Sequence, residues 1–311
     1  MTINEAELPR PKILVVDDTP ANLVAMRRLL AKMDCEVVEV ADGNAALSAC
    51  LDHEFALILL DVQMPGMDGF EVATLLAESD ECKRAPIIFV TAAYKDDLNR
   101  LTGYEVGAVD YIAKPINEFI LLSKVKVFLD LYRSRAALKI AELAARHRAT
   151  HDPLTDLPNR MLFADRLAGG IARARRESRL LALIYIDIDR FKPVNDRYGH
   201  ATGDALLKAI ATRLRTMLRA SDTVARLGGD EFAALLENID SRADAEALVE
   251  LMQQALSRPF SLQLAGHTAT VDVQVGASLG LAIYPDDGDS DDALIAHADA
   301  RMYALKNAGR H

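Results

Sequence analysis

The sequence has few of the features that mark secreted or membrane-spanning proteins. Only three cysteines, Cys35, Cys50 and Cys82, occur in 311 residues, and their number and spacing exclude a disulfide framework and a zinc site. We therefore expect free thiols in a reducing cytosol. The longest apolar run, Leu180–Ile186, is much shorter than the roughly 18–20 residues that span a bilayer, and the N-terminus shows no signal peptide. These absences predict a cytoplasmic protein without membrane insertion.

Positive charge is scarce as well. The chain has 36 Lys and Arg against 46 Asp and Glu, a net charge of −10, which makes it a poor candidate for wrapping a nucleic-acid polymer. Residues 1–116 hold 10 basic and 20 acidic side chains, residues 117–150 hold 7 and 3, and residues 151–311 hold 19 and 23. A chain of 311 residues fits two domains of about 150 residues each. The sequence therefore predicts two domains separated by a basic stretch.

Residues 10–116 alternate short apolar or β-branched runs with helical stretches. The expected strands are 13–16, 37–40, 56–60, 87–90 and 109–112. The expected helices are 22–32, 44–53, 70–78 and 96–106. This alternation predicts an α/β domain with a doubly wound sheet of five parallel strands. In such a sheet, ligands bind at the carboxyl ends of the strands.

Chemically active side chains end four of these strands. Asp17 and Asp18 end the first, Asp61 the third, Thr91 the fourth and Lys114 the fifth. A single aspartate after a strand is usually a helix cap or turn residue, but four such positions together point to one site. Clustered carboxylates repel one another unless a cation is present, and oxygen ligands suit Mg²⁺. A carboxylate beside Mg²⁺ and a lysine can accept a phosphoryl group, because the two cations offset its charge.

Residues 12–116 resemble the receiver domain of response regulators, which has a flavodoxin-like fold. The resemblance implies that a cognate histidine kinase phosphorylates Asp61, and that Asp17, Asp18 and Asp61 hold Mg²⁺ or Mn²⁺. The groups implied to sense the phosphoryl group are Thr91, Tyr111 and Lys114. Taken by itself, Tyr111 is equally compatible with an ordinary half-buried strand position.

Residues 117–150 predict one long helix, because Asn117–His147 contains neither Gly nor Pro. Its apolar positions are spaced 3, 4, 3, 4 and 7 residues apart, as in the seam of a coiled coil, although Lys139 occupies the skipped position. These positions are Leu122, Val125, Leu129, Tyr132, Ala136 and Leu143. Two interpretations stay open, a terminal helix with a solvated linker or a stalk that dimerises the chain. We favour the stalk.

Residues 151–311 predict a second α/β domain. The expected helices are 161–175, 203–218, 243–257 and 291–307, and the expected strands are 180–187, 223–226 and 232–236, with a β-rich stretch up to residue 283. Gly228 and Gly229 join two of these strands, and glycine accepts the positive φ of a tight hairpin turn. The sequence therefore predicts a mixed, mainly antiparallel sheet.

Two acidic motifs in this domain suggest a metal site. Asp187 lies in the run Ile186-Asp-Ile-Asp at a strand end, and Asp230-Glu231 follows the glycine pair. If the two strands are neighbours, Asp187 and Asp230 converge on one cation. Such an arrangement suits Mg²⁺-dependent nucleotide chemistry.

The acidic motifs belong to a set of six that occur in order between residues 152 and 311. The other four are Asp152-Pro-Leu-Thr155, Gly199-His200 with Gly203-Asp204, Ser278-x-Gly280 with Tyr284-Pro285, and Ala298-Asp299-x-x-Met302-Tyr303-x-x-Lys306. In these motifs the domain resembles the GGDEF family of diguanylate cyclases. The resemblance implies a nucleotidyl-cyclase-like fold that condenses two GTP into cyclic di-GMP and pyrophosphate, with Mg²⁺ or Mn²⁺.

The resemblance also implies roles for single residues. Asp187, Asp230 and the Ile188 carbonyl would hold the metal, and Glu231 would help to activate the attacking 3′-hydroxyl. The residues implied for the nucleotide are Asn195 and Asp204 at guanine, Phe191 and Lys192 at the triphosphate loop, and Lys306 and Arg310 at the terminal phosphates. An aspartate accepts from both donors of the guanine edge, whereas adenine would leave an acceptor unpaired. Because one domain offers one half-site, the reaction implies a homodimer.

A further motif, Arg219-x-x-Asp222, precedes the glycine pair. At this spacing the resemblance implies a product-inhibition site, whereas an exposed ion pair would be the ordinary interpretation. The chain departs from the family at three positions, one of them His311, where the family usually has Asn. Glu250 stands where a secondary arginine is often found, and Asp156 stands where Gly is usual.

Together these patterns predict a phosphorylation-regulated diguanylate cyclase in a two-component pathway. A catalytically silent GGDEF module that binds nucleotide is the alternative, but silent members usually lose the acids of the turn motif, and Gly228–Phe232 is intact. A DNA-binding regulator is disfavoured, because residues 151–311 contain no helix-turn-helix and have an excess of acids.

Overall fold

The computed structural model describes residues 9–78, 85–92, 108–263 and 270–308. The chain divides into two compact units, Met1–Leu143 and Ala144–His311, and each is described by itself. None of the described helices is long and apolar enough to cross a membrane.

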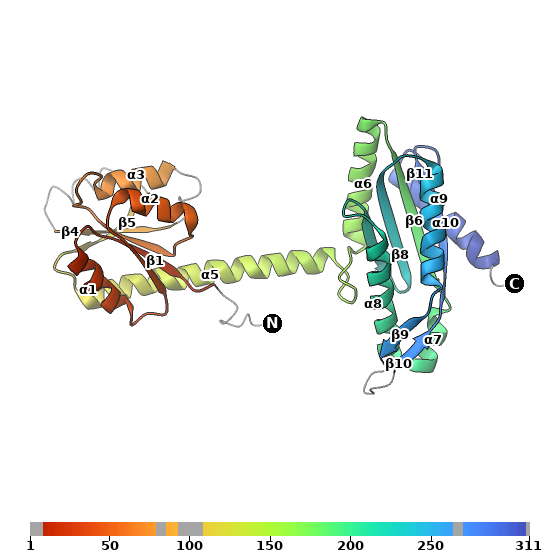
Figure 1. The fold of residues 1–311 in the computed structure, drawn as a ribbon, viewed down its shortest axis with the longest axis horizontal. Helices are drawn as coiled ribbons and strands as arrows, with labels where there is room; N and C mark the ends of the chain where they lie inside the picture. Colours follow the sequence, from red (N-terminus) through yellow and green to blue (C-terminus); the bar gives the residue numbers. More distant parts are fainter. Residues whose placement is uncertain (1–8, 79–84, 93–107, 264–269, 309–311) are drawn as a thin grey trace. The chain divides into compact units, whose positions relative to one another are not determined.

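The first unit contains the predicted sheet of five parallel strands. The strands are β1 (Lys12–Val16), β2 (Glu36–Val40), β3 (Leu57–Asp61), β4 (Ile87–Thr91) and β5 (Ala108–Ala113), in the spatial order β2-β1-β3-β4-β5. The helices are α1 (Pro20–Leu30), α2 (Gly43–Asp52), α3 (Gly69–Glu78) and α5 (Glu118–Thr150), the last of which continues past Leu143 into the second unit. The expected helix 96–106 lies outside the described residues. The doubly wound fold class is confirmed (Figure 1).

Different helices cover the two faces of this sheet. Successive strand residues point to opposite faces, so Leu14 and Val16 of β1 pack with α2 and α3, whereas Ile13 and Val15 pack with α1 and α5 (Figure 1). Such burial of apolar side chains on both faces explains why the strands read as nearly continuous apolar runs. The carboxyl ends of the strands are left to carry polar side chains.

Helix α5 confirms the predicted long helix but changes its seam. Leu121, Val125 and Leu129 are buried in the core of the first unit, against the sheet. Val125 and Leu129 therefore cannot serve as seam positions of a coiled coil, and this part of the prediction was wrong. A heptad pattern records an apolar face, but it does not say whether a second copy or the chain's own sheet covers that face.

The second unit contains a sheet of four strands, β6 (Leu180–Asp189), β7 (Thr223–Gly228), β8 (Glu231–Ile239) and β11 (Gly276–Tyr284), in the order β11-β6-β8-β7. Every neighbouring pair of these strands is antiparallel. A separate antiparallel pair comprises β9 (Phe260–Gln263) and β10 (Thr270–Val273). The mainly antiparallel sheet is thus confirmed, whereas the expected mixture with parallel pairs is absent from the described strands of this unit.

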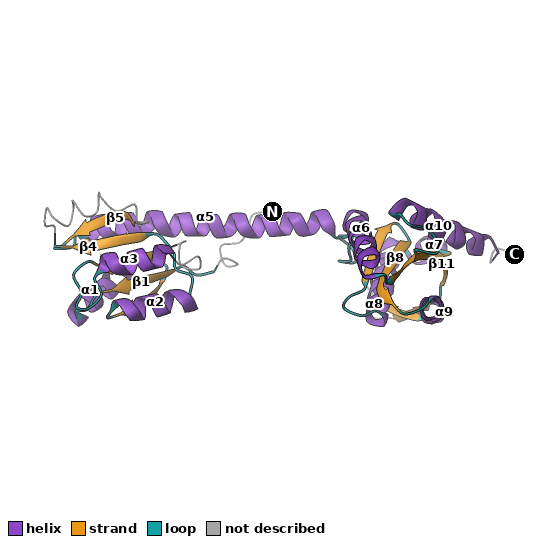
Figure 2. Cartoon of the chain, turned by 90° about the horizontal axis from the view of Figure 1, so that it is seen from above, coloured by secondary structure: helices purple, strands orange, loops and turns teal. Residues whose placement is uncertain are grey.

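Four helices cover this sheet in two layers. Helices α8 (His200–Met217) and α9 (Arg242–Leu256) pack on one face, and α6 (Arg160–Glu177) and α10 (Asp291–Ala308) pack on the other (Figure 2). Each face has its own apolar core, because β6 and β8 send alternate residues to opposite sides. The middles of both central strands are therefore buried on both faces.

One short helix was not predicted from the sequence. Residues Phe191–Tyr198 form α7, and Gly199 then separates it from α8 with a φ of 83°. Pro193 lies in the first turn of α7, where its missing N–H removes no helical hydrogen bond. Phe191 and Lys192 were expected in a loop, and this expectation was wrong, because both residues belong to a helix.

Candidate functional site

The acids at the strand ends of the first unit come together. Oxygen atoms of Asp17, Asp18 and Asp61 all lie within 4.8 Å of one another, and Asp17 and Asp61 are buried. Lys114 Nζ lies 2.8 Å from Asp61 Oδ2 and 3.2 Å from Asp17 Oδ2. Asn22 donates to both oxygens of Asp17, at 2.9 and 3.0 Å. Sequence reasoning did not single out Asn22, which lies on α1, five residues after the acid that it holds.

Burial and charge act in opposite directions in this cluster. Burial raises the pKa of Asp61, and the Lys114 ammonium offsets only part of this effect. Burial alone would lower the pKa of Lys114, but hydrogen bonds and charge from Asp61 and Asp17 outweigh it and raise that pKa. A buried carboxylate whose charge is only partly compensated fits a further cation, and carboxylate oxygens are the ligands that Mg²⁺ prefers.

The two other predicted residues of this region lie on β4 and β5. Thr91 is completely buried at the end of β4, and its carbonyl accepts a 2.7 Å hydrogen bond from the Lys114 N–H. Tyr111 lies on β5 and remains 41% exposed. The end of β4 is thus tied directly to the residue that contacts Asp61, whereas Tyr111 keeps a solvent-accessible ring.

In the second unit, the sheet register brings the two predicted metal ligands to adjacent positions. Asp187 of β6 pairs with Glu231 of β8, and the Ile188 N–H donates to the Asp230 carbonyl at 3.2 Å. Strands β6 and β8 are therefore neighbours, as the predicted convergence of Asp187 and Asp230 requires. Gly228 and Gly229 have φ angles of 146° and 52°, so the turn needs glycine as expected.

A lysine from the last helix reaches the same point. Lys306 Nζ of α10 lies 2.7 Å from each carboxylate oxygen of Asp187, a side chain that is only 7% exposed. Oδ1 is fully buried, and the Lys306 ammonium is its ion-pair partner among the residues that the structure describes. A buried carboxylate held by one lysine still has lone pairs that can bind a metal cation, and carboxylate oxygens are the ligands that Mg²⁺ prefers. Arg310, the predicted partner of Lys306, lies outside the described residues.

Arg226 holds the base of the glycine turn. Its guanidinium donates to both oxygens of Asp152, at 2.9 and 3.1 Å, and to the Gly229 carbonyl, at 3.0 and 2.8 Å. Burial would raise the pKa of Asp152, but hydrogen bonds from Thr155 and Arg226 outweigh it and lower that pKa. Sequence reasoning missed Arg226. No sequence signal links it to Asp152, because the two residues are 74 positions apart.

The Asp152 motif also contacts the end of α5. Asp156 has a φ of 59°, a left-handed conformation that favours glycine. Aspartate is among the other residues that tolerate this conformation. His147 Nε2 lies 2.6 Å from Asp156 Oδ1, and the His147 and His151 rings stack at 4.0 Å. Asn159 accepts from two N–H groups at the start of α6 and donates to the Ala149 carbonyl.

The residues predicted to read guanine lie on α7 and α8. Asn195 is half-buried on α7, and Asp204 is exposed in the first turns of α8. Phe191 and Lys192 open α7 rather than a loop. Both residues thus lie at the start of a short helix, and their contact with the triphosphate remains a prediction.

The Arg219 motif is not an ion pair within the described residues. Asp222 instead accepts from two backbone groups, Arg219 N–H at 3.1 Å and Glu237 N–H at 3.3 Å. Arg219 is exposed, so its guanidinium remains accessible to a ligand. Glu250 is exposed on α9.

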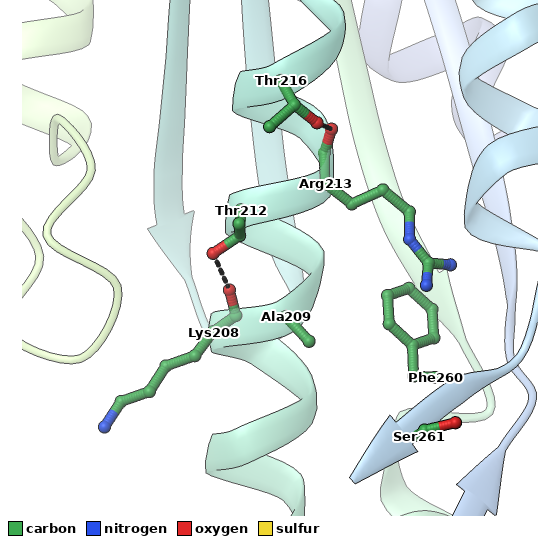
Figure 3. Close-up of a pocket in the computed structure, with 7 residues that line it drawn as sticks. All are labelled: Lys208, Ala209, Thr212, Arg213, Thr216, Phe260 and Ser261. Carbon is green, nitrogen blue, oxygen red and sulfur yellow. Dashed lines mark hydrogen bonds between the residues drawn. The ribbon is translucent and has the colours of Figure 1, made fainter.

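A groove of about 500 Å³ between α8 and β9 contains none of the predicted site residues (Figure 3). Arg213 points across it and stacks on the Phe260 ring, 3.5 Å from its centroid. The same guanidinium donates to the carbonyls of Ala255, in the last turn of α9, and of Arg258 and Pro259, which follow the helix; the last carbonyls of a helix need such partners. Arg213 therefore has a structural role there.

The two units define a response regulator, a receiver domain joined to a nucleotide-cyclase-like output domain. A family model described as response regulator receiver domain matches residues 13–126, and one described as diguanylate cyclase, GGDEF domain matches residues 149–311. The second match covers more than half of the chain, and the chain belongs to the GGDEF family.

One curated relative matches nearly the whole chain, and two others match about 60% of it. The response regulator PleD of Caulobacter vibrioides is 28% identical over 305 residues, which are 96% of this chain and 64% of the relative. The diguanylate cyclase TpbB of Pseudomonas aeruginosa is 43% identical over 182 residues, 58% of this chain and 40% of TpbB. The bifunctional cyclase and phosphodiesterase MucR of the same species is 43% identical over 60% of this chain and 27% of MucR. The chain thus spans less than two thirds of each relative.

A solved structure resembles part of the chain. The coiled coil and GGDEF domain of DgcB from Caulobacter crescentus, in complex with c-di-GMP, has a TM-score of 0.51 at 27% identity and covers 61% of this chain and 95% of that one. The likeness extends over a coiled coil and the following GGDEF domain of that protein.

Proposed function

We propose that the chain is a diguanylate cyclase that condenses two GTP into cyclic di-GMP and pyrophosphate. The observation that carries this proposal is the adjacency of Asp187 and Asp230 at an intact glycine turn, with Lys306 paired to the buried Asp187 carboxylate. The relatives named diguanylate cyclases support the same activity. A silent nucleotide-binding module would not need to retain both acids beside the turn.

Each residue then has a task in nucleotidyl transfer. Asp187, Asp230 and the Ile188 carbonyl would hold Mg²⁺ or Mn²⁺, and a bound metal would stabilise charge on the attacking and leaving oxygens. Lys306 brings a positive charge to the same point, which favours a triphosphate there. Glu231 pairs in register with Asp187, close enough to the metal site to assist removal of the 3′-hydroxyl proton.

The acids of the first unit would receive the controlling signal. A histidine kinase in the cytoplasm would phosphorylate Asp61, with Asp17 and Asp18 holding Mg²⁺ or Mn²⁺. Lys114 contacts Asp61 directly, and its backbone is bonded to Thr91, so both can respond to the added charge. Tyr111 would be the side chain that changes its exposure.

Two copies must face each other, because each domain provides one half-site. Val127, Leu131 and Leu138 of α5 are 62%, 41% and 70% exposed, and their spacings of 4 and 7 residues fit a heptad seam. We infer that this stripe, rather than the seam predicted from Val125 and Leu129, joins the homodimer. Leu131→Arg with Leu138→Arg would then give a monomer with little activity. Leu143→Arg, which alters an exposed leucine off the stripe, would leave the dimer intact.

Arg219 and Asp222 would form an inhibitory site for the product. The accessible Arg219 guanidinium can bind phosphate, and Asp222 is fixed by two backbone hydrogen bonds beside it. Arg219→Ala would therefore relieve inhibition by added cyclic di-GMP while the initial rate in its absence stays unchanged.

The activity itself is tested by incubating the full chain with GTP and Mg²⁺ and separating the products, with Asp230→Ala as the control. Formation of cyclic di-GMP and pyrophosphate that depends on Asp230 supports the proposal. Nucleotide binding without any cyclic dinucleotide, with or without a phosphoryl mimic on Asp61, would favour the silent module.

A further inference from the structure

Gly203 occupies an unusual place between α7 and α8. It is buried in the first turn of α8, and its N–H bonds to the Gly199 carbonyl at 3.2 Å. A Cβ built on it would lie 1.9 Å from Asn195 Oδ1, 3.0 Å from Asn195 Cγ and 3.2 Å from Phe191 Cζ. The side-chain amide of Asn195 therefore occupies the space that any other residue at position 203 would fill.

The backbone gives no reason for a glycine at this position. Four described glycines have positive φ angles, namely Gly66, Gly199, Gly228 and Gly229, and Gly203 is not among them. Inside a helix with ordinary angles, glycine is less favourable than alanine. The missing side chain must therefore serve packing, and the atoms that use the space belong to Asn195 and Phe191.

The neighbours of this contact are the residues assigned to the nucleotide. Asp204 follows Gly203 directly, and Phe191 and Asn195 face α8 from α7. A polar side chain that discriminates between bases must be held in one place, because a misplaced donor or acceptor loses its hydrogen bond. Contact with Gly203 restricts the carboxamide on the side of α8.

We propose that Gly203 is a positioning residue for base recognition, which lets the Asn195 carboxamide lie against α8 beside Asp204. The inference rests on the proposed function, in which Asn195 and Asp204 read guanine. A methyl group at position 203 would displace the flexible end of Asn195 while leaving the metal ligands on β6 and β8 untouched. The loss would therefore appear in nucleotide binding and selectivity more than in the chemical step.

The test is a double-mutant cycle in the full chain with Gly203→Ala, Asn195→Ala and the two together, assayed for cyclic di-GMP formation and for the ratio of kcat/KM between GTP and ATP. Gly203→Ala should raise the KM for GTP about tenfold, lower kcat by less, and reduce the preference for GTP. In the Asn195→Ala background, the same substitution should change KM less than twofold. This non-additivity is the signature of two residues in contact.

Gly169→Ala is the matched control. Gly169 lies within α6, and the nearest atom that a Cβ there would meet is Arg173 Nη1 at 3.4 Å, an ordinary contact. This variant should keep the KM and the GTP preference of the wild type. Thermal unfolding of every variant checks that the second unit is folded.

Several outcomes would overturn the inference. They are an unchanged KM and selectivity in Gly203→Ala, an equal loss in both backgrounds, or a Gly203→Ala chain that does not fold although the double variant does. If the wild type binds GTP without forming product, the proposed cyclase activity fails, and the same cycle on GTP affinity decides the role of Gly203. If the wild type does not bind GTP, both conclusions fail.

Discussion

The two acidic sites of this chain are built in different ways. In the receiver, three acids from the ends of β1 and β3 approach within 4.8 Å, and Lys114 follows β5 of the same sheet. In the GGDEF domain, Asp187 lies near the end of β6, Asp230 lies in a hairpin turn, and the lysine comes from the last helix. A parallel sheet gathers strand ends at one edge, whereas the antiparallel sheet needs added contacts to aim its acids.

This difference predicts that the two acidic sites have separate roles. The receiver acids should control the rate, and the hairpin acids should perform the chemistry. The hairpin should also depend on distant partners such as Asp152, whereas the receiver site should tolerate loss of a charge.

The largest expected effect is at the hairpin. Asp230→Ala should lower the rate of cyclic di-GMP formation at least about a hundredfold, because charge on the transferred phosphate loses its stabilisation. Labelling of Asp61 by a small phosphoryl donor should continue at the wild-type rate. Loss of labelling in this variant would contradict the separation of the two acidic sites.

A smaller effect is expected at the base of the turn. Asp152→Asn should lower kcat about tenfold and destabilise the second unit by about 2–3 kcal/mol. This cost is below that of a fully buried pair, because the Arg226 and Asp152 side chains are 11% and 15% exposed. Urea unfolding followed in parallel with activity measures both quantities.

Arg173→Ala provides the control for that experiment. It removes a bidentate pair with Glu237 in the same unit, but its side chain is 46% exposed. It should therefore cost less than about 1 kcal/mol and leave kcat unchanged. Equal losses in the two variants would show that the turn does not depend on Arg226.

In the receiver, Asp61→Asn should be stabilising in the absence of metal. Burial raises the pKa of Asp61, so the charged carboxylate opposes folding above that pKa, and the penalty disappears below the ordinary range of an aspartate. The variant should unfold at a higher temperature than the wild type at pH 7 in EDTA, and this advantage should disappear in acid. A lower melting temperature at pH 7 would contradict this account.

The smallest effect is expected where α5 meets the Asp152 motif. The hydrogen bond with His147 lowers the pKa of Asp156, and both side chains are more than half exposed. His147→Ala should raise the pKa of Asp156 towards its ordinary value in a carboxylate NMR titration, whereas the pKa of Asp152 should not change. The stabilising contact is present above the ordinary aspartate range and is lost as the pH falls through the lowered pKa.

The receiver site was the easier to predict from sequence. Its acids, Thr91 and Lys114 all end strands, and strand ends are visible as the last residues of apolar runs. The convergence of Asp187 and Asp230 could be predicted only on the condition that β6 and β8 are neighbours. The pairing of two antiparallel strands cannot be deduced from two apolar runs that lie apart in the sequence. The turn at Gly228 and Gly229 could be predicted from the sequence, because a turn with positive φ angles favours glycine.

The missed features depend on partners far apart in sequence or on a short element. Asp152 and Arg226 are 74 residues apart, so neither residue indicates the other. Helix α7 has 8 residues, too few for a clear apolar period. The seam on α5 failed because Val125 and Leu129 belong to the core of the receiver, which no heptad pattern can reveal.

The central claim is that one acidic site regulates what the other catalyses. It is tested most directly by the initial rate of cyclic di-GMP formation in the wild type and in Asp61→Asn, each with and without a small phosphoryl donor and Mg²⁺. We expect the donor to change the wild-type rate and to leave the Asp61→Asn rate, which stays measurable, unchanged. An equal response in both proteins, or no cyclic di-GMP in either, would contradict it.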